Sequence, residues 1–302
     1  LAYQDITWFA TPRRMAVKVT ALISQQADKE IEKRGPAINV AFDQEGNASK
    51  AALGWARSNG IAIEEAQRLK TDKGEWLLHK ALQQGKTVAQ LMPDMVNVAL
   101  TKLPIPKPMR WGSERIQFIR PVHTLTMLYG EQILNGSTLG VSSNNLVMGH
   151  RFHHHGLVTL KDAQSYEATL KEAYVVVDYQ ARQDTIVKQI EQAAESLGGT
   201  ALVDQELLDE VTALVEWPVT LIGSFDKDFL NVPAEPLIYS MKDHQKYFPV
   251  TDKQGNLLNQ FIFVTNIESK EPEKVIQGNE KVIRPRLADA EFFYKTDQKQ
   301  TL

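Results

Sequence analysis

A run of alternating prolines places the strongest constraint on how this chain can fold. Proline fixes φ and lacks a backbone N–H donor, so such a run cannot continue a helix or enter the middle of a sheet. The three residues are Pro104, Pro106 and Pro108. They predict an extended, polyproline-like connection. The chain is therefore predicted to divide here. Residues 1–103 form an N-terminal α+β portion, and residues 104–302 form a strand-rich, then α/β portion that ends in a truncated helical segment.

Local signals predict helices and strands in both portions. After Thr87, apolar residues recur at intervals of three and four up to Leu103, the pattern of an amphipathic helix. Capping side chains predict further helices that begin after Asn47 or Ser49, after Asp178 and after Asp204. Strands are expected at residues 7–10, 15–22, 174–177, 219–225 and 260–265, with several short ones between 116 and 147. Because the elements lack a strict βαβ rhythm, we predict an α+β fold with mixed and antiparallel sheets and packed helices.

Charge and cysteine content limit the classes of function. The net charge of −3 means that nucleic acid, if bound, must meet local basic patches. The chain has no cysteine, which excludes disulfides, thiolate metal sites and cysteine nucleophiles and fits a reducing cytoplasm. No apolar run approaches the roughly 18–20 residues that span a bilayer, so no membrane contact is expected.

One cationic run lies beside aromatic residues late in the chain. Lys242, His244 and Lys246 share a short polar segment that ends at Tyr247 and Phe248. Lysines neutralise nucleic-acid phosphates and exposed rings stack on unpaired bases, so this run is a candidate RNA contact. A solvated basic face over an aromatic core is the alternative interpretation.

A second cationic run, Lys281, Arg284 and Arg286, flanks Pro285. A proline inside a helix removes one hydrogen bond and clashes with the preceding turn, so the helix is predicted to break or kink among these cations. Burial of the aromatic residues at 292–294 is expected to anchor the segment. The bend is then expected to present a phosphate-binding patch together with the lysines of the first run.

Two pairs of adjacent cations complete the candidate set. Arg13 and Arg14 follow a proline, and Lys33 and Arg34 precede a Gly-Pro pair. Neighbouring residues on a strand face opposite sides, so at most one of each pair can meet a given phosphate. Structural salt bridges are the alternative role for these four side chains.

The four histidines at 150 and 153–155 are the most conspicuous chemical cluster. Consecutive histidines point in different directions on any regular backbone, whereas a dedicated metal site needs ligands that converge. We therefore expect a partly exposed loop and no metal site. The sequence also holds no phosphate-binding glycine loop and no G-x-S-x-G nucleophile motif, so no catalytic residue is assigned.

Several sequence blocks resemble, in order, the beta subunit of bacterial heterotetrameric glycyl-tRNA synthetase. In the first half they are TPRRM (11–15), IEKRGP (31–36), KAALGWAR (50–57), TDKGEW (71–76), LPIPK (103–107), MRWG (109–112), RPVH (120–123) and GHRF (149–152). In the second half they are EWPV (216–219), MKDHQKYFPV (241–250) and NEKVIRPRLADAEFFY (279–294). The resemblance also implies a region similar to the B3/B4 module of phenylalanyl-tRNA synthetase.

This resemblance implies a role in glycine–tRNA ligation without a chemical step in this chain. In the family, ATP, Mg²⁺ and glycine are handled by the separate alpha subunit, so no cofactor is expected here. The implied partners are the alpha subunit and tRNA(Gly), in an alpha2-beta2 assembly in the cytoplasm. Family members continue into an HD-type domain and an anticodon-binding domain, so this chain is expected to be an N-terminal fragment that is inactive alone.

The expected function is tRNA positioning and subunit assembly, and two alternatives stay open. The B3/B4-like resemblance points to a hydrolytic editing module. Glycine, however, is the smallest amino acid, so its site can exclude competitors by steric clash and needs no editing. A pure interaction scaffold is the other alternative, and a salt-dependent RNA affinity distinguishes it from RNA binding.

Overall fold

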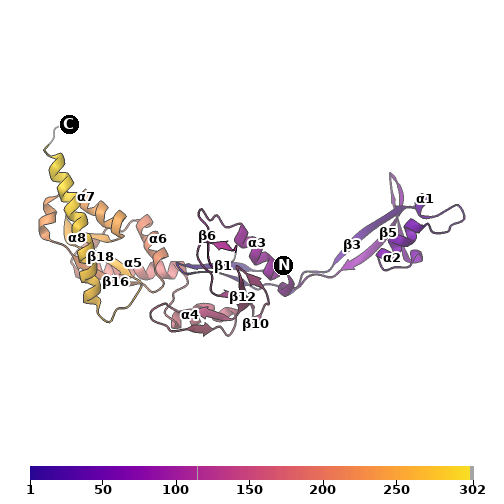
Figure 1. Cartoon of the computed structure of the whole chain (residues 1–302), viewed down its shortest axis with the longest axis horizontal. Helices are drawn as coiled ribbons and strands as arrows, with labels where there is room; N and C mark the ends of the chain where they lie inside the picture. The colour runs from indigo at the N-terminus through magenta and orange to yellow at the C-terminus, as the bar shows by residue number, and fades with distance from the viewer. Residues whose placement is uncertain (114, 300–302) are drawn as a thin grey trace. The chain divides into compact units, whose positions relative to one another are not determined.

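The computed structural model describes residues 1–113 and 115–299 and has an α+β fold (Figure 1), as predicted. Its contacts divide the chain into two compact units. Unit 1 comprises Leu1–Gln4 and Ala21–Val98, and unit 2 comprises Asp5–Thr20 and Ala99–Leu302. Residues 5–20 thus pack with unit 2 rather than with the remainder of residues 1–103. The reason is Phe9, which is 2% exposed within an apolar cluster of unit 2.

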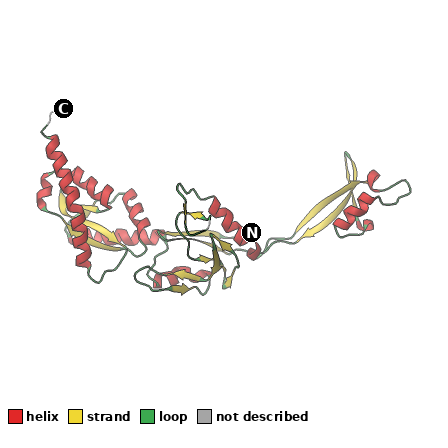
Figure 2. Ribbon diagram, viewed as in Figure 1, coloured by secondary structure: helices red, strands yellow, loops and turns green. Residues whose placement is uncertain are grey.

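Unit 1 is built on a three-stranded antiparallel sheet in the order β3-β5-β4 (Figure 2). Its elements are β3 (Lys29–Ala37), α1 (Ile38–Ala41), α2 (Lys50–Ser58), a 3-10 turn at Ile63–Glu65, β4 (Gln67–Thr71), β5 (Gly74–Gln83) and most of α3 (Val88–Thr101). Ser49 caps α2 by accepting a hydrogen bond from the Ala52 amide, as predicted. The helix expected after Thr87 is present, but Met95 on its apolar stripe is 52% exposed.

The first half of unit 2 consists of a hairpin and many short strands. The hairpin pairs β1 (Asp5–Thr11) with β2 (Arg14–Thr20), with Pro12 and Arg13 in its turn. The other elements are β6 (Met109–Arg110), β7 (Gln117–Phe118), β8 (Leu125–Thr126), β9 (Leu128–Tyr129), β10 (Gln132–Ile133), β11 (Ser137–Thr138), β12 (Val141–Asn144), β13 (Leu146–Met148), β14 (Leu157–Thr159) and α4 (Tyr166–Glu172). Strands β12 and β8 pair in parallel while the other pairs here are antiparallel, so the sheets are mixed, as predicted.

The strand expected at residues 174–177 does not form. Val175 and Val177 are buried, as a strand would have buried them, but the segment has no ladder of backbone partners. Its Val176 amide donates to the Glu216 carbonyl over 2.9 Å. Burial without a neighbouring strand therefore leaves a packed loop.

The second half of unit 2 has helices on both faces of an antiparallel sheet in the order β15-β17-β18-β16. The strands are β15 (Thr200–Ala201), β16 (Val219–Ser224), β17 (Phe248–Thr251) and β18 (Leu257–Thr265). Side chains of β18 alternate between the faces. Ile262 packs with α5 (Tyr179–Ser196) and α6 (Gln205–Leu214), while Phe261 packs with α7 (Ala234–Tyr239) and α8 (Pro272–Asp297). Asp178 caps α5 and Asp204 caps α6, as predicted.

Helix α8 continues through Pro285 from Pro272 to Asp297, so the chain does not break there, while the alternative of a kink stays a prediction. Ile283 and Leu287 lie one turn apart and are 0% exposed, so tertiary packing on both sides of the proline offsets its missing hydrogen bond. Anchoring by residues 292–294 was also predicted wrongly in part. Phe292 and Phe293 are 64% and 63% exposed, and Tyr294 alone packs against the core.

No helix in the described part of the chain combines the length and apolar character needed to cross a membrane. The resemblance of residues 104–302 to a B3/B4-type module stays a prediction.

Candidate nucleic-acid interface and the polar network beside it

A buried ion pair joins the N-terminal hairpin to the body of unit 2. Glu216 is 0% exposed, and its Oε1 lies 3.2 Å from Nε of Arg14 and accepts a hydrogen bond of 2.6 Å from Thr11 Oγ1. Arg14 also donates to the Met148 carbonyl over 3.1 Å, at the end of β13. A buried carboxylate needs a partner to offset its lost hydration. Arg14 is therefore a structural residue, the alternative role foreseen for it.

A second buried cation, Arg182, links four segments of unit 2. It is 0% exposed and donates to the carbonyl oxygens of Thr212 (3.1 Å), Val176 (2.7 Å) and Ala10 (2.8 Å). Burial lowers the pKa of its guanidinium, and the nearby Glu216 carboxylate opposes that change. The sequence analysis missed Arg182. The signal was its helical spacing with Ile186 and Ile190, which places it on the apolar stripe of α5.

The histidine segment is a partly exposed loop, as expected, but His150 itself is 0% exposed. Its Nδ1 accepts hydrogen bonds of 3.3 Å from the amides of both Phe152 and His153, and its own amide donates to the Ala173 carbonyl over 2.9 Å. Burial lowers the pKa of His150, and Asn266 and Glu216 oppose that change. A neutral imidazole thus organises the loop from within.

The other histidines have no shared ligand geometry. His153 Nε2 accepts a hydrogen bond of 2.9 Å from the Glu268 amide, whereas His155 is exposed. Within residues 1–113 and 115–299, no group of three or more His, Cys, Asp or Glu side chains is arranged to hold a metal ion.

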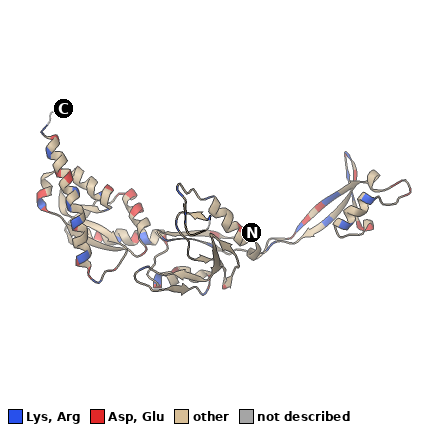
Figure 3. Cartoon of the chain, viewed as in Figure 1, with Lys and Arg blue, Asp and Glu red and all other residues tan. Residues whose placement is uncertain are grey.

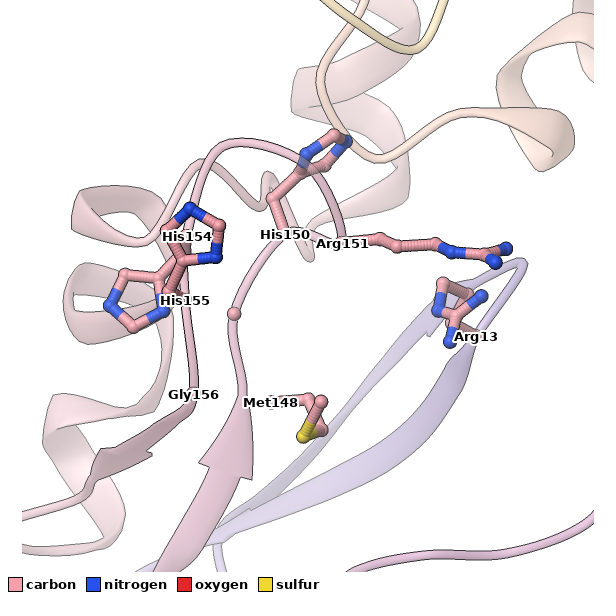
Figure 4. Close-up of a pocket in the computed structure, with 8 residues that line it drawn as sticks. Arg13, Met148, His150, Arg151, His154, His155 and Gly156 are labelled. Atoms are coloured by element: carbon pink, nitrogen blue, oxygen red, sulfur yellow. The ribbon is translucent and has the colours of Figure 1, made fainter.

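A pocket of about 160 Å³ opens beside this loop (Figure 4). It is lined by Arg13, Met148, Gly149, His150, Arg151, His154, His155 and Gly156. Arg13 comes from the β1–β2 turn, and the other residues come from the end of β13 and the loop before β14. Gly149 is needed because a Cβ there would lie 2.6 Å from the His154 ring, and Gly156 has a φ of +86°.

The lysines of the first cationic run are paired with carboxylates. Lys242 forms an ion pair with Asp204, and Lys246 Nζ lies 2.8 Å from Glu210. The hydrogen bond to Glu210 raises the pKa of Lys246. The ring of His244 meets Tyr239 edge-on at 5.2 Å. The carboxylates reduce the positive field that this run offers to a phosphate.

The second cationic run is exposed on α8, where Figure 3 shows basic residues along the helix. Lys281, Arg284 and Arg286 have no ion-pair partner among the residues that the structure describes. Residues three apart on a helix share a flank, whereas residues two apart face away from each other. Lys281 and Arg284 therefore form one cationic flank, and Arg286 lies on the opposite one.

In unit 1, the guanidinium carbon of Arg34 lies 3.7 Å from the centre of the Trp76 ring, a cation–π contact. Lys33, its neighbour on β3, points to the other face of the sheet and is exposed. Of the ten predicted contact residues, Lys33 and Arg34 thus belong to unit 1 and the other eight belong to unit 2.

These observations define an α+β protein with a cationic helix flank and a cationic pocket. Comparison with known proteins adds the family. The profile of the glycyl-tRNA synthetase beta subunit matches residues 1–302. The chain belongs to that family, as the resemblance implied.

Individual relatives agree over the whole chain. The glycine–tRNA ligase beta subunit of Colwellia psychrerythraea is 70% identical over 302 residues, 100% of this chain and 44% of that protein. Those of Pseudoalteromonas atlantica and Pseudoalteromonas translucida are 59% and 56% identical with the same shares covered. This chain therefore spans less than half the length of these relatives.

Proposed function

We propose that this chain positions tRNA for a glycine–tRNA ligase and contributes to assembly of that enzyme. In this proposal the full-length beta subunit pairs with an alpha subunit in an alpha2-beta2 assembly in the cytoplasm. The alpha subunit uses ATP and Mg²⁺ to attach glycine to tRNA(Gly). Holding a substrate in reactive geometry contributes strongly to rate even when the holding residues supply no chemical group.

The observation that carries the RNA-binding part is the cationic flank of α8. Lys281 and Arg284 are exposed, and no carboxylate of the described residues pairs with them. They extend from a helix that is fixed to the core by Ile283 and Leu287. A rigid helix can place such cations against successive phosphates, and no carboxylate of the described residues neutralises their charge first.

The test is tRNA binding by the full-length assembly in which Lys281 and Arg284 are both replaced by Gln. Each lost phosphate contact lowers the slope of log affinity against log salt by about 0.9 for a duplex, so the slope should fall by about 1.8. Arg286→Gln on the opposite flank is the matched control and should change the slope little. Unchanged binding by the double variant, with normal subunit assembly, would favour a pure interaction scaffold.

A further inference from the structure

The cationic pocket of unit 2 has an electrostatic imbalance. Arg13 and Arg151 both line it (Figure 4). Within the described residues, no carboxylate pairs with either guanidinium. Glu216 does not compensate them, because its buried charge is already balanced by Arg14. Two like charges at one small cavity repel, and a bound anion relieves that repulsion.

Both sides of the pocket are held in place before any ligand binds. Arg14 fixes the hairpin turn through its contacts with Glu216 and the Met148 carbonyl. His150 fixes the opposite loop by accepting the amide hydrogens of Phe152 and His153. A site that is ordered in advance loses little conformational entropy on binding.

The size of the pocket limits what can enter it. Its volume of about 160 Å³ is below the roughly 300–1,000 Å³ of pockets that enclose drug-sized molecules. A pocket of this volume has room for a phosphate group, with the rest of a nucleotide outside its opening.

An aromatic surface is present beside that opening. Phe152 is 59% exposed, and the guanidinium carbon of Arg151 lies 5.5 Å from the centre of its ring. Exposed aromatic rings next to cations are the usual stacking platforms for unpaired bases. We propose that the pocket binds a backbone phosphate of single-stranded RNA between Arg13 and Arg151, with a neighbouring base stacked on Phe152. The proposal rests on the proposed RNA-binding function but on residues separate from the α8 flank.

The test uses the full-length assembly and two labelled probes, a single-stranded RNA and an RNA duplex of equal length. Arg13→Gln with Arg151→Gln removes the contacts to that one phosphate, and the salt slope for the single strand should fall by about 0.7. Phe152→Leu should weaken single-strand binding about tenfold while leaving duplex binding unchanged. The control variant replaces Lys227 and Lys253, which are exposed in the same unit, by Gln. It removes the same charge and should change neither the salt slope nor the affinity for the single strand.

Photocrosslinking locates the contact without a variant. Irradiation with the single strand should add nucleotide mass to the tryptic peptide of residues 152–161, which begins at Phe152 because Arg151 precedes it. Crosslinks confined to other peptides would overturn the proposal even if a variant fails to fold.

Failure of the pocket proposal can be distinguished from failure of the proposed function. Absence of single-strand binding, or equal binding by the arginine variant and the lysine control, overturns the pocket proposal while the α8 test on tRNA still stands. If Phe152→Leu weakens neither probe, or both equally, the assignment to single-stranded RNA is wrong. Displacement of the RNA from peptide 152–161 by an acidic peptide at far lower concentration than by unlabelled RNA would assign the pocket to a protein partner.

Discussion

Replacing Arg14 by Met should lower the free energy of unfolding of unit 2 by far more than is usual for a residue beside an exposed turn. The Glu216 side chain is 0% exposed and that of Arg14 only 13% exposed, so the pair is shielded from water. Removing one partner of a buried pair leaves an uncompensated charge and costs about 3–5 kcal/mol, against about 0–1 kcal/mol for a surface pair. The apolar stem of Met keeps most of the packing volume.

The assay is denaturant unfolding followed by tryptophan fluorescence, since Trp217 adjoins Glu216. Arg13→Met, one residue away and exposed, is the matched control and should change the free energy of unfolding by less than about 0.5 kcal/mol. Combining Arg14→Met with Glu216→Gln removes both charges and should recover part of the loss, since the buried carboxylate is gone. A cost below about 1 kcal/mol for Arg14→Met would refute the argument that this pair is buried and coupled.

Three further outcomes are expected. Because burial holds the pKa of His150 below its ordinary value of 6.5, the unfolded chain binds a proton that the folded chain does not. The free energy of unfolding should therefore be highest above about pH 6.5 and fall as the pH decreases below it. His150→Asn keeps an acceptor for the Phe152 and His153 amides and should flatten this fall in melting experiments at different pH values. An equal fall in the variant would show that His150 is not the group that titrates. Pro285→Ala should raise the unfolding free energy, by up to about 3 kcal/mol, because α8 is continuous there; a loss measured by denaturant titration would show that the proline is needed. The isolated chain should not catalyse glycine-dependent pyrophosphate exchange, and detectable exchange in purified protein would contradict the assignment of that chemistry to the alpha subunit.

Helix starts that carry a capping side chain were predicted correctly. Ser49, Asp178 and Asp204 each accept a hydrogen bond from a helix amide three residues onward, an interaction that sequence spacing alone reveals. The strands expected at residues 7–10 and 15–22 are likewise present as β1 and β2. Such signals depend on neighbours within one turn and not on the tertiary fold.

Features that depend on distant contacts were missed. Pro285 stays helical only because Ile283 and Leu287 are buried by other elements. The pairing of Lys246 with Glu210 joins residues far apart in sequence, as does that of Arg14 with Glu216. His150 contacts Ala173 and Asn266, both far downstream in the chain, so its sequence neighbours gave no sign of its burial. Cationic residues are visible in a sequence, but whether a carboxylate neutralises them is decided by the fold.

The central claim is that this chain holds tRNA, and a crosslinking map of tRNA on the intact assembly tests it most directly. The account predicts crosslinks in peptides of α8 that carry Lys281 and Arg284, lost when both residues are replaced by Gln. A map with tRNA crosslinks elsewhere in the assembly and none in residues 1–302 would contradict it.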